Sequence, residues 1–574
     1  MNRPLLILVF LALIVKGACL SAQVAARFDI LITEIFPDPT PSIGMPPYEF
    51  IEITNVSAIP YNLKDWKIGD GNSLATITIN FILQPGSIAI ICTGSATTAF
   101  SSFGNTIGVT NFPSLDNDAD LLFLRSKEGH TIHAVSYEIS WYRNDLKSKG
   151  GWTLEMIDTR NPCAGISNWN ASTEAAGGTP GKKNSVNGNS DDDEAPSLIR
   201  TYAIDSTTIA AVFDEPIDSA SASIASRYTL DKNFSSALEA LPLGPMFTEV
   251  LLKFPQQLTE GTVYDLTVSG ITDCRGNMIG SKNKAKTGRP SVPDTFDIVV
   301  NELLFNPKSD GFDFIELYNK SKKIIDLAQL YSANRNATGS LINTSQLSDI
   351  PYLLFPDEFI VFTENTGWLR QNYVLKTYDN IVNLPSLPSL PDDKGTLVIA
   401  NVQGKIIEEL RYDAKWHFAL IENEEGISLE RIDYSAPTQN KNNWTSAAST
   451  AGFGTPGYQN SQFKADLQMQ GLISTNPKVF SPDNDGFEDQ ATITYQMAAP
   501  GFVANITIFD ANGRAVRYLA KNATLALQGN FRWDGLDDNL QRLPMGIYIV
   551  FTEIFTMLGK TKKFKNIVTL ARKF

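Results

Sequence analysis

The sequence is short of the residues on which most enzyme active sites depend. Among 574 residues there are only three histidines, His130, His133 and His417, and four cysteines. Histidine is the commonest general base and metal ligand near neutral pH, so this kind of chemistry has few candidates. The cysteines and histidines also lack the spacing of a zinc site. Carboxylate chemistry is not excluded, because the chain carries 62 Asp and Glu residues.

Basic residues are outnumbered, with 48 Lys and Arg against those 62 acids and a net charge of −14. A polyanion would meet a repulsive field, which argues against a general nucleic-acid-binding protein. The chain end around 560–573 is locally basic, and DNA binding through it stays an alternative to a basic edge strand. The 43% of hydrophobic residues indicates packed globular domains rather than disorder.

Long apolar runs are absent after the N-terminus. Residues 5–15 form an unbroken apolar run that is too short to span a membrane. Small residues follow, with a cleavage point after Ala22, so we predict a signal peptide over 1–22 and an exported protein, secreted or on the cell surface. Cys19 raises a lipoprotein signal as the alternative, although Lys16 stands where such signals carry an apolar residue.

Cleavage would leave an odd number of cysteines, Cys92, Cys163 and Cys274, so at least one stays free or bonds to another chain. Export permits disulfides. A Cys163–Cys274 bond would fix two adjacent domains, and Cys92–Cys163 is the rival pairing. Spacing alone does not decide between them.

The main feature of the sequence is an internal repeat of about 160 residues. Three segments of the first copy recur in the second in the same order: 28–53 as 296–317, 151–158 (GWTLEMID) as 426–433 (GISLERID), and 177–185 (GGTPGKKNS) as 452–461 (GFGTPGYQNS). Within each copy, short runs alternate apolar and polar residues between Gly, Asp, Asn and Pro turns, as strands do. We predict an all-β chain in which each copy is an antiparallel β-sandwich of two sheets.

The repeated motifs resemble those of the lamin-tail domain, an Ig-like β-sandwich that also occurs in exported bacterial proteins. The motifs are E-I-x-x-x-P, E-F-I-E-I-x-N, G-W-x-L-E and the final G-T-P-G-x-x-N-S. The resemblance covers 28–187 strongly. The second copy, 295–462, diverges, since Ile427 replaces the tryptophan and Phe453 interrupts the glycine pair.

The other two segments resemble further exported modules. Residues 196–290, with their FDEPID turn and DCRGN segment, resemble the bacterial Ig-like domains of surface-layer proteins. Residues 463–574 contain W-D-G-x-D followed by L-P-x-G-x-Y, as in the Ig-like domain of flagellar hook-capping proteins and in type IX secretion sorting domains. Together with the two copies, these resemblances imply about four tandem Ig-like antiparallel β-sandwiches. For the last domain the resemblance implies attachment or secretion.

Paired acids are the first candidates for chemistry. Glu34, Glu49 and Glu52 recur in the second copy as Glu302, Asp313 and Glu316. Glu49 and Glu52 are three apart on a predicted strand, so they point to opposite faces and form no local catalytic pair. We predict that these acids face solvent and oppose edge-to-edge strand pairing.

The strongest candidate for a ligand is the loop that holds Asp483, Asp485 and Asp489. Its carboxylates alternate around Gly486, and Ca²⁺ prefers several oxygen ligands at such spacing. The alternative is an Asx-type turn that satisfies its own backbone. The acidic stretch 184–197 is predicted to be a solvated linker.

The remaining candidates favour structure over chemistry. We place His130 and His133 on opposite faces of one strand and His417 in a packed aromatic corner. Trp152, Trp169 and Trp444 recur beside the G-T-P-G ending, which favours closing the sandwich edge over a sugar platform.

We therefore predict no catalytic residue, no cofactor other than possible Ca²⁺, and no enzyme activity. We interpret the chain as an exported protein that is secreted or lies on the cell surface. It would bind an unknown extracellular protein or glycan, or act as a scaffold. Outer-membrane or other surface attachment through the last domain fits this reading. The alternative is an accessory subunit of an extracellular hydrolase or nuclease.

Overall fold

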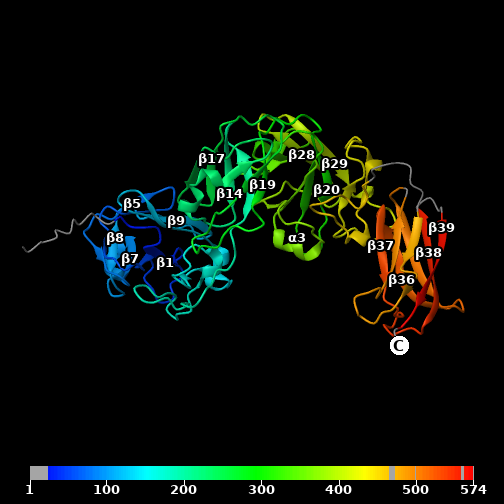
Figure 1. Ribbon diagram of the computed structural model, residues 1–574, viewed down its shortest axis with the longest axis horizontal. Helices are drawn as coiled ribbons and strands as arrows, with labels where there is room; N and C mark the ends of the chain where they lie inside the picture. Colours follow the sequence, from blue (N-terminus) through cyan, green and yellow to red (C-terminus); the bar gives the residue numbers. More distant parts are fainter. Residues whose placement is uncertain (1–23, 464–471, 498, 557–560, 573–574) are drawn as a thin grey trace, which may run out of the picture.

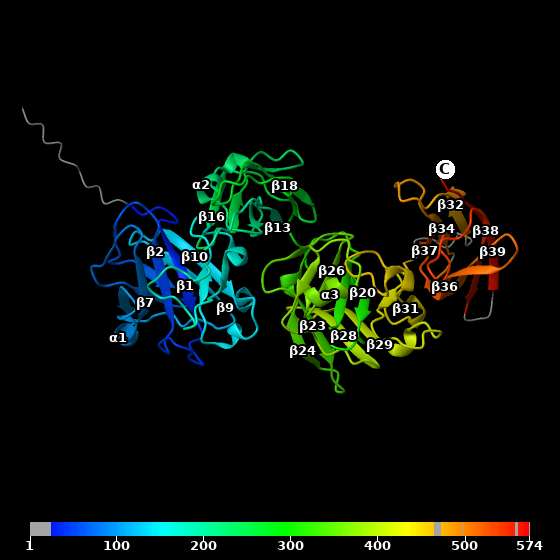
Figure 2. The ribbon, with the colours of Figure 1, turned by 90° about the horizontal axis from the view of Figure 1, so that it is seen from below.

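The computed structural model describes residues 24–463, 472–497, 499–556 and 561–572. The predicted signal peptide and Cys19 lie outside them. The described chain forms four β-sandwich domains arranged in a row, with the first and last domains at opposite ends (Figure 1; Figure 2). The prediction of an all-β chain of tandem β-sandwiches is confirmed.

The first domain packs a six-stranded sheet against a four-stranded one. Its six-stranded sheet has the order β12(Trp169–Ala171), β11(Leu154–Met156), β1(Ile30–Phe36), β2(Phe50–Asn55), β7(Ile88–Thr93), β8(Thr106–Val109). Its four-stranded sheet has the order β10(Thr131–Glu138), β9(Ala119–Arg125), β4(Lys67–Gly69), β5(Leu74–Thr76), and β3(Tyr61–Asn62) pairs with β6(Ile82–Leu83). Aliphatic and aromatic side chains between the sheets form one large core.

The third domain repeats this topology strand for strand. Its six-stranded sheet has the order β31(Trp444–Ser446), β30(Leu429–Arg431), β20(Ile298–Leu304), β21(Phe314–Asn319), β26(Phe359–Thr363), β27(Ile381–Asn383). Its four-stranded sheet has the order β29(Ile406–Asp413), β28(Lys394–Asn401), β23(Leu330–Arg335), β24(Leu341–Gln346), and β22(Ile325–Asp326) pairs with β25(Leu353–Leu354). The two domains thus share their strand order as well as their motifs.

Two details depart from the sequence prediction. The sheets are not wholly antiparallel, because β7 pairs in parallel with β8, and β26 does so with β27. In addition, β1 and β20 are buried along their whole length instead of being half-buried. The reason is that the G-T-P-G segment of each repeat crosses the outer face of the sheet, where Thr179 N donates to Glu34 on β1 and Thr455 N donates to Glu302 on β20.

The second domain is a smaller sandwich between the two copies. One sheet has the order β13(Leu198–Ala203), β14(Thr208–Phe213), β17(Glu249–Lys253), β16(Glu239–Leu243), and the other has the order β15(Tyr228–Leu230), β18(Tyr264–Val268), β19(Lys284–Thr287).

The fourth domain consists of a three-stranded sheet and a five-stranded sheet. The three-stranded sheet has the order β32(Leu472–Asn476), β34(Ala491–Gln496), β37(Gln528–Trp533). The five-stranded sheet has the order β33(Val479–Phe480), β39(Thr561–Leu570), β38(Gly546–Thr556), β35(Phe502–Phe509), β36(Ala515–Leu525). Phe463 stacks on Tyr434 at 4.3 Å between ring centroids, so the third domain reaches at least to residue 463.

Helices are few and short in the described segments: α1(Thr97–Phe100), α2(Ser219–Ala222) and α3(Thr366–Asn372). None of these helices has the length and apolar character needed to cross a bilayer.

The first and second domains are joined by several bonds. The Sγ atoms of Cys163 and Cys274 form a disulfide, and Cys92 is a buried free thiol. The Arg27 guanidinium donates to the Ile217 carbonyl at 2.9 Å and lies 4.2 Å from the Phe247 ring centroid. These contacts come from segments far apart in the sequence, so they restrict movement at this junction.

The fourth domain is bonded to the third. Ser449 N donates to Thr524 Oγ1 at 3.0 Å, and Leu527 N donates to the Ser461 carbonyl at 3.1 Å. The Thr450 and Tyr495 hydroxyls lie 2.7 Å apart. This junction therefore also carries specific hydrogen bonds.

Candidate functional site

Three glutamates of the first domain lie side by side in the middle of its six-stranded sheet. Glu34 on β1 is paired with Glu52 on β2 and with Glu155 on β11, and all three side chains are fully buried. In the third domain Glu302 is paired with Glu316 and Glu430 in the same way. We call these sets the glutamate clusters.

Each glutamate cluster binds the G-T-P-G segment that ends its repeat. In the first domain Glu34 accepts from Thr179 N at 2.7 Å and Glu52 accepts from Gly181 N at 2.7 Å. The third domain repeats both bonds, from Thr455 N to Glu302 at 2.8 Å and from Gly457 N to Glu316 at 2.5 Å. Glu155 and Glu430 each accept from a threonine and a serine hydroxyl of the same segment. The clusters thus clamp the end of each repeat onto the sheet.

The prediction that the acids of the repeated strands face solvent is wrong for Glu34, Glu52, Glu302 and Glu316, which are buried. Local alternation cannot show that a segment more than 120 residues later covers the outer face. Glu49 and Asp313 do stand apart from the clusters and are half-buried, and Glu49 accepts from Leu115 N at 3.3 Å. Neither Glu49 with Glu52 nor Asp313 with Glu316 therefore forms a pair of carboxylates that face each other across a catalytic site.

Burial makes the cluster carboxyls weak acids. It raises the pKa of Glu52 to about 8, and burial together with the neighbouring Glu430 raises the pKa of Glu302 to about 8. Burial also raises the pKa of Glu34 and of Glu316, and in each case a second cluster glutamate adds to the effect. A buried like-charged pair favours protonation of one member, whereas the hydrogen bonds donated to these carboxyls favour the ionised form.

The histidines are built into the cores or lie in a turn. His133 Nδ1 accepts from Ile32 N at 2.9 Å, its Nε2 lies 3.1 Å from the Pro162 carbonyl, and burial lowers its pKa to about 4. His417 is buried beside Phe305, and burial lowers its pKa to about 4 as well. His130 lies in the turn before β10 rather than on the strand that was predicted to hold it. None of the three faces another histidine.

The repeated tryptophans belong to the domain cores. Trp169 and Trp444 are buried, and each lies near a second tryptophan, Trp141 at 6.0 Å and Trp416 at 6.3 Å between ring centroids. Trp152 is half-buried beneath the Lys147 ammonium. They do not form an exposed platform.

The predicted calcium loop brings its three carboxylates together. Asp483, Asp485 and Asp489 each offer one oxygen within 4.8 Å of the others. Asp489 accepts from Asn484 N at 2.6 Å and from Gly486 N at 2.9 Å. Such backbone bonds are those of the alternative Asx-type turn, so the loop geometry is compatible with both readings.

A second acidic group lies at the junction of the first two domains. Asp192, Glu215 and Asp273 offer oxygens within 4.8 Å of one another. Burial, with Asp192 and Asp273 nearby, raises the pKa of Glu215 to about 8. Since Asp192 is only partly exposed and its carbonyl accepts from Asn277, the stretch 184–197 is not the fully solvated linker that was predicted.

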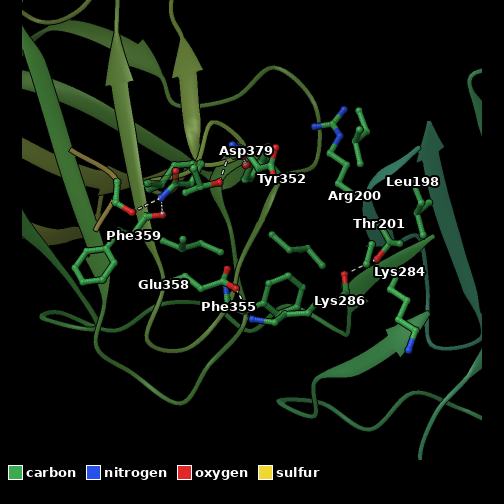
Figure 3. Close-up of a pocket in the computed structure, with 18 of the residues that line it drawn as sticks. Leu198, Arg200, Thr201, Lys284, Lys286, Tyr352, Phe355, Glu358, Phe359 and Asp379 are labelled. Carbon is green, nitrogen blue, oxygen red and sulfur yellow. Dashed lines mark hydrogen bonds and ion pairs between the residues drawn. The ribbon is translucent and has the colours of Figure 1, made fainter. Parts of the chain in front are cut away.

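The feature that sequence reasoning missed is a cleft between the second and third domains, which we call the interdomain cleft. It has a volume of about 580 Å³, within the ordinary range of ligand pockets. Strands β13 and β19 of the second domain form one wall. The other wall comes from β25, the start of β26 and the loop 377–380 of the third domain (Figure 3).

An ion pair and a cluster of apolar side chains connect the two walls of the interdomain cleft. Lys286 Nζ reaches across to Glu358 Oε1 at 2.5 Å, as Figure 3 shows. Tyr202 of the second domain packs beside Leu353 and Phe355 of the third. These contacts join the second domain to the third.

Two polar atoms in the cleft walls are buried but make no hydrogen bond among the described residues. They are Arg200 Nε on β13 and Asn380 Oδ1 on the opposite wall. The Arg200 Cζ atom lies 5.7 Å from the centre of the Tyr352 ring, whose hydroxyl donates to the Asp379 carbonyl at 2.7 Å. Buried polar atoms are normally paired, so these two mark the cleft as a place for a polar ligand.

Comparison with known proteins assigns a family to one segment. The model of the family described as Lamin Tail Domain matches residues 23–138, which supports the lamin-tail resemblance of the first copy. The matched segment ends with β10, and β11 and β12 continue the same sheet beyond it. No curated protein matches the sequence.

Several solved structures of bacterial proteins show a weak likeness. The S-layer protein SbsC is 15% identical with a TM-score of 0.16, over 66% of this chain and 55% of that one. Latent PorU from Porphyromonas gingivalis is 10% identical with a TM-score of 0.15, over 71% and 35%. SGBP-B of Bacteroides ovatus, solved with a mixed-linkage heptasaccharide, is 10% identical with a TM-score of 0.13, over 67% and 72%. The chain thus spans about half of SbsC, and TM-scores this low assign no function to it.

Proposed function

We propose that this protein is an exported, non-catalytic protein of the cell surface or the extracellular medium that binds a ligand and acts as a scaffold. The observation that supports it most is where the candidate catalytic groups lie. The glutamate clusters are fully buried and bonded to the chain itself. His133 has hydrogen-bond partners at both ring nitrogens. A general acid or base must reach its substrate, and these groups do not.

Export is supported by two independent features. The N-terminal sequence has the composition of a signal peptide. The Cys163–Cys274 disulfide suits an oxidising compartment, where such bonds form and persist.

Attachment or secretion is the role that we propose for the fourth domain. Its strand β39 is paired with β33 only at Thr569 and Leu570, so most of its outer edge has no hydrogen-bonded strand among the described residues. Lys562, Lys563 and Lys565 are exposed along this strand. Charged lysines oppose unwanted pairing at a sheet edge, which favours a basic edge strand over a nucleic-acid site.

Calcium binding at Asp483, Asp485 and Asp489 remains a proposal. It is supported by the three converging carboxylate oxygens. Hard oxygen ligands of this kind are those that Ca²⁺ prefers.

The absence of catalysis is tested by assaying the purified protein for nuclease and glycosidase activity. We expect no turnover above a buffer blank with either substrate class. Turnover that survives purification and is lost on replacing a single carboxylate, for example in Asp379→Asn, would overturn the proposal.

A further inference from the structure

We propose that the interdomain cleft binds an acidic oligosaccharide, with a sugar carboxylate on the Arg200 guanidinium and sugar hydroxyls on Asn380 and its neighbours. The inference rests on the proposed function, because it names the ligand class of a non-catalytic binding protein. Its observations are the two unpartnered buried atoms and the distribution of charge on the two walls.

The wall that carries Arg200 favours an anionic group on the ligand. No carboxylate of the described residues lies within ion-pair distance of the Arg200 guanidinium, and its Nε is buried without a hydrogen-bond partner. A guanidinium offers its donors as a planar fork that matches a carboxylate in two parallel bonds. The Tyr352 ring beside it adds a flat apolar surface of the kind that packs against a sugar ring.

The opposite wall favours neutral hydrogen-bond donors on the ligand. Both Asn380 Nδ2 protons are directed to backbone carbonyls, of Phe359 at 3.2 Å and Gly457 at 2.8 Å. These bonds fix the orientation of the amide, so the buried Oδ1 is left as an acceptor only. The Asp379 side chain lines the same wall and adds carboxylate oxygens. Hydroxyl groups satisfy such acceptors without adding charge.

The two walls differ in charge. The second-domain wall carries Arg200, Lys282, Lys284 and Lys286 with one acid, Asp214, whereas the third-domain wall carries Asp357, Glu358 and Asp379. A nucleic acid would meet the acidic wall with a phosphate on every unit and with few free hydroxyls for Asn380. A uronic acid ring carries one carboxylate and several hydroxyls at fixed distances, so one ligand satisfies both walls with little loss of conformational freedom.

The test is isothermal titration of the purified full chain with a pentamer of galacturonic acid. The matched control ligand is the same pentamer with its carboxylates methyl-esterified, which keeps the rings and hydroxyls but removes the charge. We expect the free acid to bind and the ester to bind about tenfold or more weakly, as the loss of a charge-assisted bond predicts.

Variants assign the binding to the cleft. Arg200→Gln should weaken binding of the free acid to the level of the ester, and Arg200→Lys, which keeps the charge but not the planar fork, should lie between. Lys253→Gln removes the same charge from an exposed site on β17 outside the cleft and should change nothing. Thermal unfolding of each variant separates lost binding from lost folding.

Three results would overturn the proposal: no heat with either pentamer, equal affinity for acid and ester, or unchanged affinity in Arg200→Gln. Stronger binding of a glutamate pentapeptide than of the sugar acid would also overturn it, by assigning the cleft to acidic peptides. None of these measurements concerns export or turnover. A negative titration would therefore reject the cleft proposal alone, whereas the activity assays and the export experiment test the proposed function separately.

Discussion

At the scale of single residues, the buried glutamates join the two ends of each repeat. Glu302 lies in the centre of its sheet, yet its partners Ser428 and Thr455 follow more than 120 residues later. A buried carboxyl with so many donors stabilises one arrangement of the chain, because any other leaves polar groups unpaired. The glutamates and the G-T-P-G residues that recur in both copies are thus hydrogen-bond partners of one another.

The raised pKa of the clusters predicts how stability depends on pH. The pKa of Glu52 and of Glu302 is about 8 in the folded chain, whereas an ordinary glutamate has 4.5. The folded state therefore binds protons more tightly than the unfolded state. The contribution of the clusters to the free energy of unfolding should be largest below about pH 4.5, fall as the pH rises to about 8, and then level off.

The double variant Glu52→Gln/Glu302→Gln should flatten this profile, because glutamine is neutral at every pH. Each tenfold difference in proton affinity is worth about 1.4 kcal/mol, so a rise from 4.5 to about 8 corresponds to roughly 5 kcal/mol for each glutamate. Urea unfolding between pH 4.5 and 8 measures it, with the exposed Glu239→Gln as the control for loss of one charge. An unchanged pH profile in the double variant would contradict the assignment.

Gly178 shows how closely the G-T-P-G segment approaches the sheet. A Cβ at this position would lie 2.7 Å from Met45 Sδ and 2.8 Å from Glu34 Oε1. We expect Gly178→Ala to destabilise the first domain by roughly 1–3 kcal/mol through overpacking. Gly280→Ala, where a Cβ meets no atom within 4 Å, is the matched control and should change the unfolding midpoint little. Equal midpoints for both variants would show that the segment is looser than described.

Calcium gives a residue-scale prediction for the fourth domain. Titration of the full chain with Ca²⁺ should give a binding isotherm that Asp483→Asn weakens, because the substitution removes one of three converging charges. Asp192→Asn serves as the control, since it alters the other acidic group and should leave this isotherm in place. If Asp483→Asn leaves the isotherm unchanged, the loop is an Asx-type turn only.

At the scale of elements, the disulfide links a loop of the first domain to a turn of the second. Cys163 and Cys274 are 111 residues apart in the sequence. Closing so long a loop restricts the unfolded chain, so Cys163→Ser/Cys274→Ser should lose roughly 2–5 kcal/mol. Chemical unfolding of the two proteins measures the difference, and thiol titration of denatured protein reports on Cys92. Stability equal to that of the parent chain would show that the other junction contacts suffice.

The sequence predicted the elements better than their surroundings. Period-2 alternation and the repeat located β1, β2 and their counterparts β20 and β21, because both signals are local or come from comparing two copies. The same alternation predicted a solvent-facing side for Glu34, which is covered by Thr179 from the far end of the repeat. Long-range cover of this kind leaves no trace in a window of a few residues.

At the scale of the whole molecule, the four domains form an extended row whose junctions are bonded (Figure 2). The interdomain cleft exists only because the second and third domains meet. Its walls carry Arg200 and Asn380, which are 180 positions apart and belong to no shared motif. The sequence therefore had no signal for this site, whereas the calcium loop, made of neighbours in the chain, could be predicted.

The central claim, that this is an exported binding protein delivered to the outside of the cell, is tested most directly by protease treatment of intact cells that make it. The account predicts that the full chain is cleaved from outside while a cytosolic marker stays protected. A chain ending at Phe463, which lacks the fourth domain, should be exported but protected from the protease. Full-length protein that resists protease until the cells are lysed, and that co-fractionates with the cytosolic marker, would contradict the account.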